Sequence, residues 1–249
     1  MQQNLQSSIS AELRARFRSA ERVVVLTGAG VSAESGVPTF RGGGQSAVWK
    51  GMPFDVISSG EMARRDLRAV WEWFDYRRGI LRTLSPNAAH LALARWQDWF
   101  NDFTLVTQNV DGLHQAAGSR SVRELHGNIW RARCVSCEAR RERRVETEEE
   151  LPPVCHECGE AMRPDVVLFG EMLPAGAFGY AARKSAECDL FFVVGTSALV
   201  YPAASLPEHA RRAGAYVVEV NPEETPLSGL CDESLRGKAG EVLPLFAAG

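Results

Sequence analysis

The chain has 249 residues, of which 45% are hydrophobic and 24% charged, and its formal net charge is −3. A chain of this length can bury a large core, and its nearly balanced charge excludes recognition of a nucleic acid or a membrane by bulk electrostatics. The first ten residues lack the basic and apolar regions of a secretion signal, and no apolar run is long enough to span a bilayer. We therefore expect a cytoplasmic protein and, because no interface pattern is visible, a monomer.

The predicted elements alternate between helices and apolar strands. The first helix is predicted over Ser10–Ala20 with Ser10 as its N-cap, and the β-branched strand Arg22–Leu26 follows it. Three further buried strands are predicted at Phe103–Thr107, Leu190–Val194 and Ala215–Val220. Helices are predicted at Ala88–Trp99 and Pro202–Ala213. Strands that alternate with helices favour an α/β fold with a doubly wound, parallel, Rossmann-like sheet.

Two stretches interrupt this alternation. Residues 42–85 are rich in Trp, Phe and Arg, with helical spacing over Glu61–Leu84, and residues 127–163 contain four paired cysteines. We predict a discontinuous Rossmann-like domain from residues 10–41, 86–126 and 164–249, with a helical insertion at residues 42–85. The segment 127–163 is predicted to be a second insertion, here called the zinc module.

The zinc module takes its name from two cysteine pairs, Cys134-x-x-Cys137 and Cys155-x-x-Cys158, with 17 residues between them. In a chain without a secretion signal this spacing indicates metal ligation before disulfides. Four thiolates would hold one zinc ion tetrahedrally and leave no position open for water, so the zinc is predicted to be structural. Two disulfides are the alternative interpretation.

A glycine-rich loop directly follows the predicted strand Arg22–Leu26. The segment Gly28-Ala-Gly30-Val-Ser-Ala33 fits a G-x-G-x-x-G/A dinucleotide-binding fingerprint. Gly28 would allow the tight turn, Gly30 the approach of the backbone to a pyrophosphate, and Ala33 close packing of the helix. The acidic residue expected about 20 positions later is absent, which excludes an ordinary dehydrogenase fingerprint. By itself, the loop is also compatible with a glycine-rich turn that binds nothing.

A longer pattern contains this loop. The run Gly28–Arg41, GAGVSAESGVPTFR, resembles the signature of the sirtuins, a family of NAD-dependent protein deacylases. Four further motifs follow in the family's order: Gln108-Asn-Val-Asp111, His126-Gly127, Gly195-Thr-Ser197 and Asn221-Pro-Glu. The resemblance extends from Glu21 to about Leu245. Within it, the stretch Trp71–Arg78 is most similar to the branch of the family called class III.

The resemblance implies an NAD site and three catalytic residues. The NAD site would be formed by Gly28, Ala29, Gly30, Ser32, Ala33, Phe40, Arg41, Gln108, Asn109, Asp111, Gly195, Thr196, Ser197, Asn221 and Ala239. Asn109 and Asp111 would orient the ribose and nicotinamide, and His126 would be the general base, a role suited to a pKa near ~6.5. Considered alone, the Gln108–Asp111 cluster is more typical of a helix N-cap, and a lone histidine is more often structural.

The implied reaction consumes NAD as a co-substrate. The acyl oxygen of an acyl-lysine protein attacks C1′ of the nicotinamide ribose, nicotinamide leaves, and an imidate forms. His126 then deprotonates a ribose hydroxyl, which attacks the imidate carbon, and water completes release of free lysine and O-acyl-ADP-ribose. The alternatives are an NAD glycohydrolase or mono-ADP-ribosyltransferase, and a non-catalytic module that binds NAD or ADP-ribose.

Two further segments are implied to contact the substrate. Within Val166–Glu171, the residues Val167, Phe169, Gly170 and Glu171 would pair with an extended peptide, although the segment also suits an ordinary strand. In the helical insertion, Phe74 and Arg77 occupy the positions of a Tyr-x-x-Arg pair that binds acidic acyl groups such as succinyl in the class III branch. With Phe74 in place of tyrosine, we expect succinyl removal to be weakened and acetyl removal to be retained, with longer neutral acyl groups also accepted. The alternative is that Phe74 only packs into a core.

Overall fold

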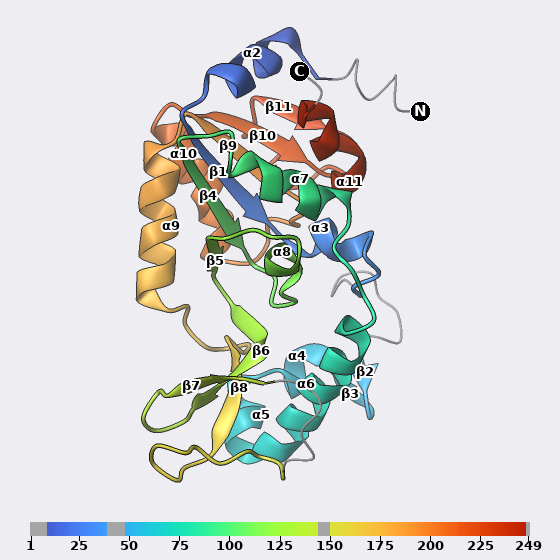
Figure 1. Ribbon diagram of the computed structural model, residues 1–249, viewed down its shortest axis with the longest axis vertical. Helices are drawn as coiled ribbons and strands as arrows, with labels where there is room; N and C mark the ends of the chain where they lie inside the picture. Colours follow the sequence, from blue (N-terminus) through green and yellow to red (C-terminus); the bar gives the residue numbers. More distant parts are fainter. Residues whose placement is uncertain (1–8, 39–47, 144–149, 248–249) are drawn as a thin grey trace.

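Residues 9–38, 48–143 and 150–247 are described by the computed structural model of the chain. They form a larger part built on a six-stranded sheet and a smaller part of short helices and a three-stranded sheet at one end of the long axis (Figure 1). The α/β fold class with a doubly wound parallel sheet is confirmed. None of the helices in these ranges combines the length and apolar character that a membrane span requires.

The large sheet has the strand order β11-β10-β9-β1-β4-β5, and every neighbouring pair is parallel. Its strands are β1 (Arg22–Thr27), β4 (Asp102–Thr107), β5 (Val122–Glu124), β9 (Leu190–Val194), β10 (Tyr216–Val220) and β11 (Glu233–Leu235). The chain moves from β1 through β4 to β5, then returns to the other side of β1 with β9. Ligands bind at such a reversal of strand order, beyond the carboxyl ends of the strands.

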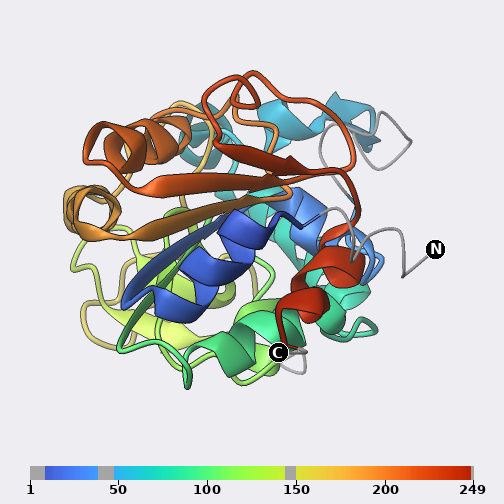
Figure 2. The same ribbon diagram turned by 90° about the horizontal axis from the view of Figure 1, so that it is seen from above.

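Both faces of the sheet are covered because alternate residues of its strands are apolar on both sides. Val23 and Val25 face one layer of helices, whereas Val24 and Leu26 face the other. The first layer contains α2 (Ala11–Ser19), α7 (Ala88–Trp96) and α11 (Ala239–Val242), and the second contains α9 (Ala175–Glu187) and α10 (Leu206–Arg212) (Figure 2). Two short helices, α3 (Ala29–Ala33) and α8 (Leu113–Ala116), begin near the carboxyl ends of β1 and β4, and the 3-10 helices Ala203–Ser205 and Leu243–Ala247 complete this part.

The smaller part combines the helical insertion with the zinc module. Its antiparallel sheet has the order β7-β6-β8, from β6 (Gly127–Cys134), β7 (Arg140–Glu142) and β8 (Met162–Val166). Beside it lie α4 (Phe54–Ile57), α5 (Gly60–Arg65), α6 (Leu67–Leu81) and the hairpin of β2 (Val48–Trp49) and β3 (Met52–Pro53). Trp71, fully buried, joins the two because its indole N–H donates to the Met162 carbonyl at 2.8 Å.

The four predicted core strands are confirmed, whereas several helix limits differ from prediction. The Glu61–Leu84 helix is interrupted at Asp66, whose carboxylate caps α6 by accepting from the Ala69 N–H at 3.0 Å. The Ala88–Trp99 helix ends at Trp96, and Pro202–Ala213 divides into a 3-10 turn and α10. The edge strands β5 and β11 and helix α9 were not predicted; each edge strand has only three residues, most of them polar.

Candidate functional site

The predicted NAD motifs meet at the carboxyl edge of the large sheet. Gly28 follows β1, Gln108 follows β4, Gly195 follows β9 and Asn221 follows β10, and these four strands are consecutive neighbours in the sheet. Parallel pairing aligns their ends: Thr27 lies opposite Thr107 on one side and Val194 on the other. The sheet therefore brings together residues that are more than 190 positions apart in the sequence.

The glycine loop and the loop after β9 approach each other at backbone distance. The Gly30 N–H donates to the Gly195 carbonyl at 2.7 Å, and a Cβ at Gly30 would lie only 2.7 Å from the Gly195 Cα. A Cβ at Gly28 would similarly meet Thr196 at 2.8 Å, and Gly195 itself has a φ of +58°. These glycines are thus required by loop-to-loop packing, and the approach of Gly30 to a pyrophosphate remains a prediction.

Ser32, Asn109 and Asp111 form one polar network, in which Ser32 and Asp111 are buried and Asn109 is half-buried. The Ser32 hydroxyl donates to Asp111 Oδ2 at 2.8 Å, and the Asn109 side-chain amide donates to the Ser32 Oγ and to the Gly28 carbonyl, both at 3.1 Å. Burial raises the pKa of the Asp111 carboxyl, while the Leu113 N–H and the Ser32 hydroxyl, both donating to it, act in the opposite direction. The network fixes the orientation of the two residues predicted to position the ribose and nicotinamide.

His126 lies between the large sheet and the zinc module, directly before β6. Its Nδ1 is 2.7 Å from the Gln108 carbonyl oxygen. Because a carbonyl oxygen only accepts, Nδ1 carries the proton and Nε2 keeps its lone pair in the neutral ring. Burial lowers the pKa of His126 from 6.5, with the Gln108 hydrogen bond acting against it, so the neutral form dominates at pH 7. A base-competent nitrogen is therefore available on this ring.

Some of the remaining predicted NAD residues also lie at the carboxyl edge of the large sheet. Gln108 donates to Thr196 Oγ1 at 3.0 Å, and the Asn221 amide donates to the Thr196 carbonyl at 2.9 Å, which joins three strand ends. Ala29 and Ser197 are half-buried in the two loops, Ala33 is exposed, and Ala239 is buried at the start of α11. Phe40 and Arg41 lie outside the described residues.

Phe74 and Arg77 lie on α6, in the helical insertion, and both are buried. Phe74 is 5% exposed within an apolar cluster that includes Leu113 and Ile129, as packing into a core requires. Arg77 is 7% exposed, and its guanidinium lies 5.5 Å from the centre of the Trp73 ring. Burial lowers the pKa of Arg77, and the charge of Asp111 opposes that shift, so Arg77 is electrostatically linked to the polar network.

The segment Val167–Glu171, which follows β8, is hydrogen-bonded both to His126 and to the helical insertion. The Val167 N–H donates to the His126 carbonyl at 2.9 Å, and the Phe169 N–H donates to the Ser58 carbonyl at 2.9 Å. Glu171 accepts from the Leu168 N–H at 2.9 Å, so within the described chain only the Gly170 N–H of Val167–Glu171 has no hydrogen-bond partner. The Phe169 ring is 49% exposed. The three-stranded sheet includes this part of the chain only as far as Val166, and beyond it Phe169 forms an isolated parallel bridge with Ser59.

The cysteine cluster of the zinc module is confirmed. The four sulfurs all lie within 4.8 Å of one another, with 3.4 Å between Cys134 and Cys158 and 3.7 Å between Cys137 and Cys155. A disulfide requires about 2.05 Å, whereas zinc–sulfur bonds of about 2.3 Å in a tetrahedron separate sulfurs by about 3.8 Å. All four cysteines are free, so the disulfide alternative is wrong. The backbone N–H groups of Ser136 and Cys137 donate to the Cys134 sulfur at 3.3 and 3.5 Å, an arrangement that favours a metal-binding thiolate.

Several residues that shape the site were not predicted. His90 and His114 are buried behind the Ser32 network, with ring centres 4.8 Å apart, and Arg163 binds the Glu171 carboxylate with N–O distances of 2.6 and 2.9 Å. The capping pattern Asn87-x-x-His90 is a local signal that could have identified His90. The Arg163 contact has no comparable signal, because it depends on how the segment after β8 turns back.

Comparisons with known proteins agree with this geometry. The Sir2 family profile matches residues 28–202, which is more than half of the chain. An NAD-dependent protein deacylase of Aquifex aeolicus is 48% identical over 221 residues, covering 89% of this chain and 92% of the relative. An NAD-dependent protein deacylase of Thermus thermophilus is 48% identical over 242 residues, covering 94% and 92%.

Solved structures give the same result. A Sir2 homologue in complex with NAD matches with a TM-score of 0.88 at 42% identity, covering 96% of this chain and 93% of that chain. A Sir2 protein bound to an acetylated peptide matches with a TM-score of 0.81 at 32% identity, covering 93% and 94%. Both similarities extend over the large sheet and the smaller part together.

Proposed function

The chain belongs to the Sir2 family, and we propose that it is an NAD-dependent protein-lysine deacylase. It transfers the acyl group of an acyl-lysine protein to ADP-ribose and releases nicotinamide, O-acyl-ADP-ribose and free lysine. The relatives named as NAD-dependent protein deacylases are similar over nine-tenths of their length, so the whole reacting unit has its counterpart in this chain. NAD is a substrate of this reaction, and no hydride is transferred.

The observation that carries the proposal is the tautomer of His126. The 2.7 Å contact to the Gln108 carbonyl holds the proton on Nδ1, so Nε2 is the nitrogen that takes a proton from a ribose hydroxyl. Asn109, Asp111 and Ser32, joined in one network, position the ribose and nicotinamide beside it. Because only neutral His126 is a base, the rate falls as the pH drops through a pKa that burial holds below 6.5.

The zinc ion has a structural role in this proposal. Cys134, Cys137, Cys155 and Cys158 supply all four ligands, and the bound metal fixes the fold of the module without taking part in the reaction. His126 directly precedes the module and Val167 follows it, and the Val167 N–H donates to the His126 carbonyl at 2.9 Å. Folding of the module therefore supports the base and the peptide-binding segment together.

The acyl chain enters beside α6, with Arg77 as the group that attracts an acidic acyl end. Arg77 supplies a charge-assisted contact, and Phe74 lacks the hydroxyl that would add a second one. Acetyl-lysine is thus a substrate, succinyl-lysine a weaker one than in enzymes with a tyrosine, and longer neutral acyl chains can pack against Phe74. The peptide itself pairs with the segment Val167–Gly170, where the Gly170 N–H is open to a partner.

The proposal is tested by nicotinamide release and O-acyl-ADP-ribose formation with matched acetyl-, succinyl- and decanoyl-lysine peptides. We expect acyl-dependent product formation by the wild type and a loss of about 10²- to 10⁴-fold in H126A, the usual contribution of a general base. H209A, which replaces a half-exposed histidine of α10, is the matched control and should retain activity.

The other outcomes identify the alternatives. Nicotinamide release that is indifferent to the acyl peptide would indicate a glycohydrolase or an ADP-ribosyltransferase. ADP-ribose or NAD binding without any nicotinamide release would indicate a non-catalytic binding module. Equal product formation by H126A and wild type would remove His126 as the base.

A further inference from the structure

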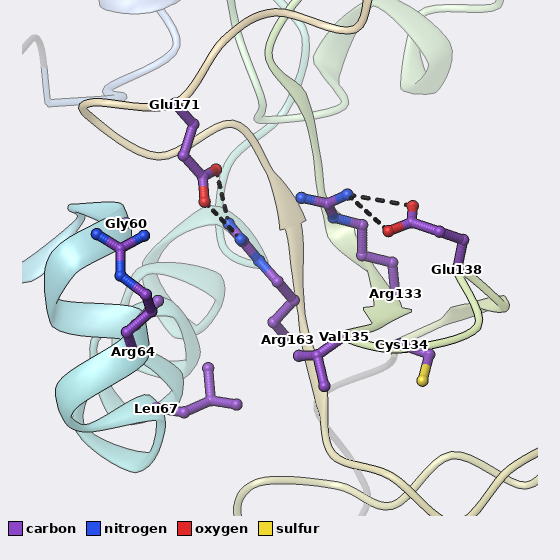
Figure 3. Close-up of a pocket in the computed structure, with 10 residues that line it drawn as sticks. Gly60, Arg64, Leu67, Arg133, Cys134, Val135, Glu138, Arg163 and Glu171 are labelled. Atoms are coloured by element: carbon purple, nitrogen blue, oxygen red, sulfur yellow. Dashed lines mark hydrogen bonds and ion pairs between the residues drawn. The ribbon is translucent and has the colours of Figure 1, made fainter.

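A pocket of about 190 Å³ lies between α5 and the zinc module, outside the NAD site (Figure 3). Its aliphatic wall comes from Ala63 and Leu67 on the helical side and from Val135 on the module side. Sites for drug-sized ligands measure about 300–1,000 Å³, so this pocket is too small for a cofactor. Its volume suits one amino-acid side chain.

The charged lining of the pocket is predominantly basic. Three arginines against two glutamates leave a formal charge of +1: Arg64, Arg133 and Arg163 against Glu138 and Glu171. Arg163 is committed to Glu171 at 2.6 and 2.9 Å, and Arg133 to Glu138 at 3.2 and 3.3 Å (Figure 3). The Arg64 side chain is exposed and, within the described residues, has no hydrogen bond or ion pair.

The pocket is continuous with the segment proposed to pair with the substrate peptide. Gly60, which lines it, donates its N–H to the Phe169 carbonyl at 3.0 Å. Glu171, which also lines the pocket, accepts from the Leu168 N–H at 2.9 Å and packs so closely on α5 that a Cβ at Gly60 would lie 3.0 Å from its side chain. The pocket therefore adjoins the segment with which the substrate peptide is proposed to pair.

We propose that this pocket is a subsite for an anionic side chain of the substrate protein, carried a few residues from the acyl-lysine. Arg64 supplies the charge that is not neutralised by the protein, and the aliphatic wall packs against the methylene groups of a glutamate. A carboxylate and a phosphorylated side chain share this chemistry, and peptides bearing each would distinguish them. The inference rests on the proposed deacylase function, because it assumes a peptide paired with Val167–Gly170.

The experiment is a scan of acyl-lysine peptides in which each of the five positions on either side carries Glu, phosphoserine, Lys or Gln, the neutral isostere of Glu. We expect one or two neighbouring positions, on one side only, where Glu lowers KM by about two- to fivefold with kcat unchanged, as an exposed ion pair would. R64A should remove this preference, and R64E should make Lys preferred over Gln at the same position. The preference should also shrink at high salt.

R65A is the matched control, because Arg65 is the adjacent exposed arginine of α5 and does not line this pocket. It should retain the full preference for Glu. Equal KM values for Glu and Gln peptides at every position, or a preference that survives R64A, would overturn the subsite while leaving the deacylase intact. Absence of acyl-dependent turnover on every peptide would instead overturn both.

Discussion

The two parts of the molecule hold their functional residues by different means. In the larger part, buried parallel strands end at one edge, and backbone pairing aligns residues such as Thr27, Thr107 and Val194 before any side chain acts. In the smaller part, the functional residues are held by the four cysteines and by arginine ion pairs. One such pair joins Arg131 to Asp165, which is 9% exposed and accepts from the guanidinium at 3.2 Å. NAD binding should therefore depend on sheet packing, and the peptide and acyl contacts on metal and charge.

Removing zinc should produce the largest difference between the stabilities of the two parts. Structural zinc contributes roughly 10–16 kcal/mol to folding of small metal domains, so a chelator, or C134S, should unfold the zinc module and abolish deacylation. The larger part should still bind ADP-ribose, measured by calorimetry. C231S replaces a half-buried cysteine outside the cluster and is the control. Full activity after the metal is removed would contradict a structural role.

Acid should destabilise the larger part through two buried histidines. Burial lowers the pKa of His90 to about 4 and that of His114 to about 3, below the value of 6.5 in an unfolded chain. Both stay neutral in the folded protein while the unfolded chain takes up protons, so stability is complete above about pH 7 and declines as the pH falls. Between pH 7 and 5 the two together should cost about 4 kcal/mol.

Urea unfolding at pH 7 and at pH 5 measures this loss of stability. The comparison of the wild type with H114Q isolates the contribution of His114. Asp111 works in the opposite direction because burial raises its pKa, but it is present in both proteins. Glutamine can still accept from or donate to Thr27, which lies 2.9 Å from His114 Nε2. A wild type and an H114Q with the same pH dependence would exclude His114 as a source of acid sensitivity.

Substituting Gly30 should weaken the NAD site without touching the smaller part. A Cβ there would meet the Gly195 backbone at 2.7 Å, and overpacking of this kind costs about 1–3 kcal/mol. G30A should lose ADP-ribose affinity while keeping its zinc. G79A is the control, since a Cβ at this exposed position of α6 meets nothing within 4 Å and should stabilise the helix slightly. Normal ADP-ribose binding by G30A would show that the two loops can separate.

The larger part could be predicted from sequence because its signals are local. Each central strand is a continuous apolar run, and the polar motifs follow directly after these runs, so parallel pairing alone predicts that the motifs meet. The edge strands β5 and β11 carry no such signal, because residues such as Arg123 and Ser234 are polar and their pairing depends on the neighbouring strand.

The contacts of the smaller part were less predictable, apart from its cysteines. The spacing of the two C-x-x-C pairs predicts that the four cysteines bind one metal ion together. No sequence spacing predicts the contacts of Arg163 with Glu171 or of Ser58 with Phe169, because these depend on the tertiary fold. The interruption of the predicted helix at Asp66 was missed because the apolar periodicity continues across it, and only the side-chain cap distinguishes two helices from one.

Restoring a tyrosine beside Arg77 is the sharpest test of how the smaller part selects an acyl group. Replacing Arg77 itself would also remove the charge facing Asp111 and so would affect every acyl substrate. F74Y instead adds one hydroxyl to a buried ring, three residues before Arg77. A neutral hydrogen bond contributes about 0.5–1.5 kcal/mol, so the ratio of kcat/KM for succinyl over acetyl peptides should rise about two- to tenfold.

The same hydroxyl should reduce turnover of decanoyl peptides, because it would be buried against an apolar chain without a partner. Y76F is the matched control: it removes a hydroxyl from the same helix at a side chain that is 51% exposed, and it should leave the acyl ranking unchanged. A succinyl-to-acetyl ratio that does not move in F74Y would assign Phe74 to the apolar core alone, since its packing with Leu113 and Ile129 would then be its whole role.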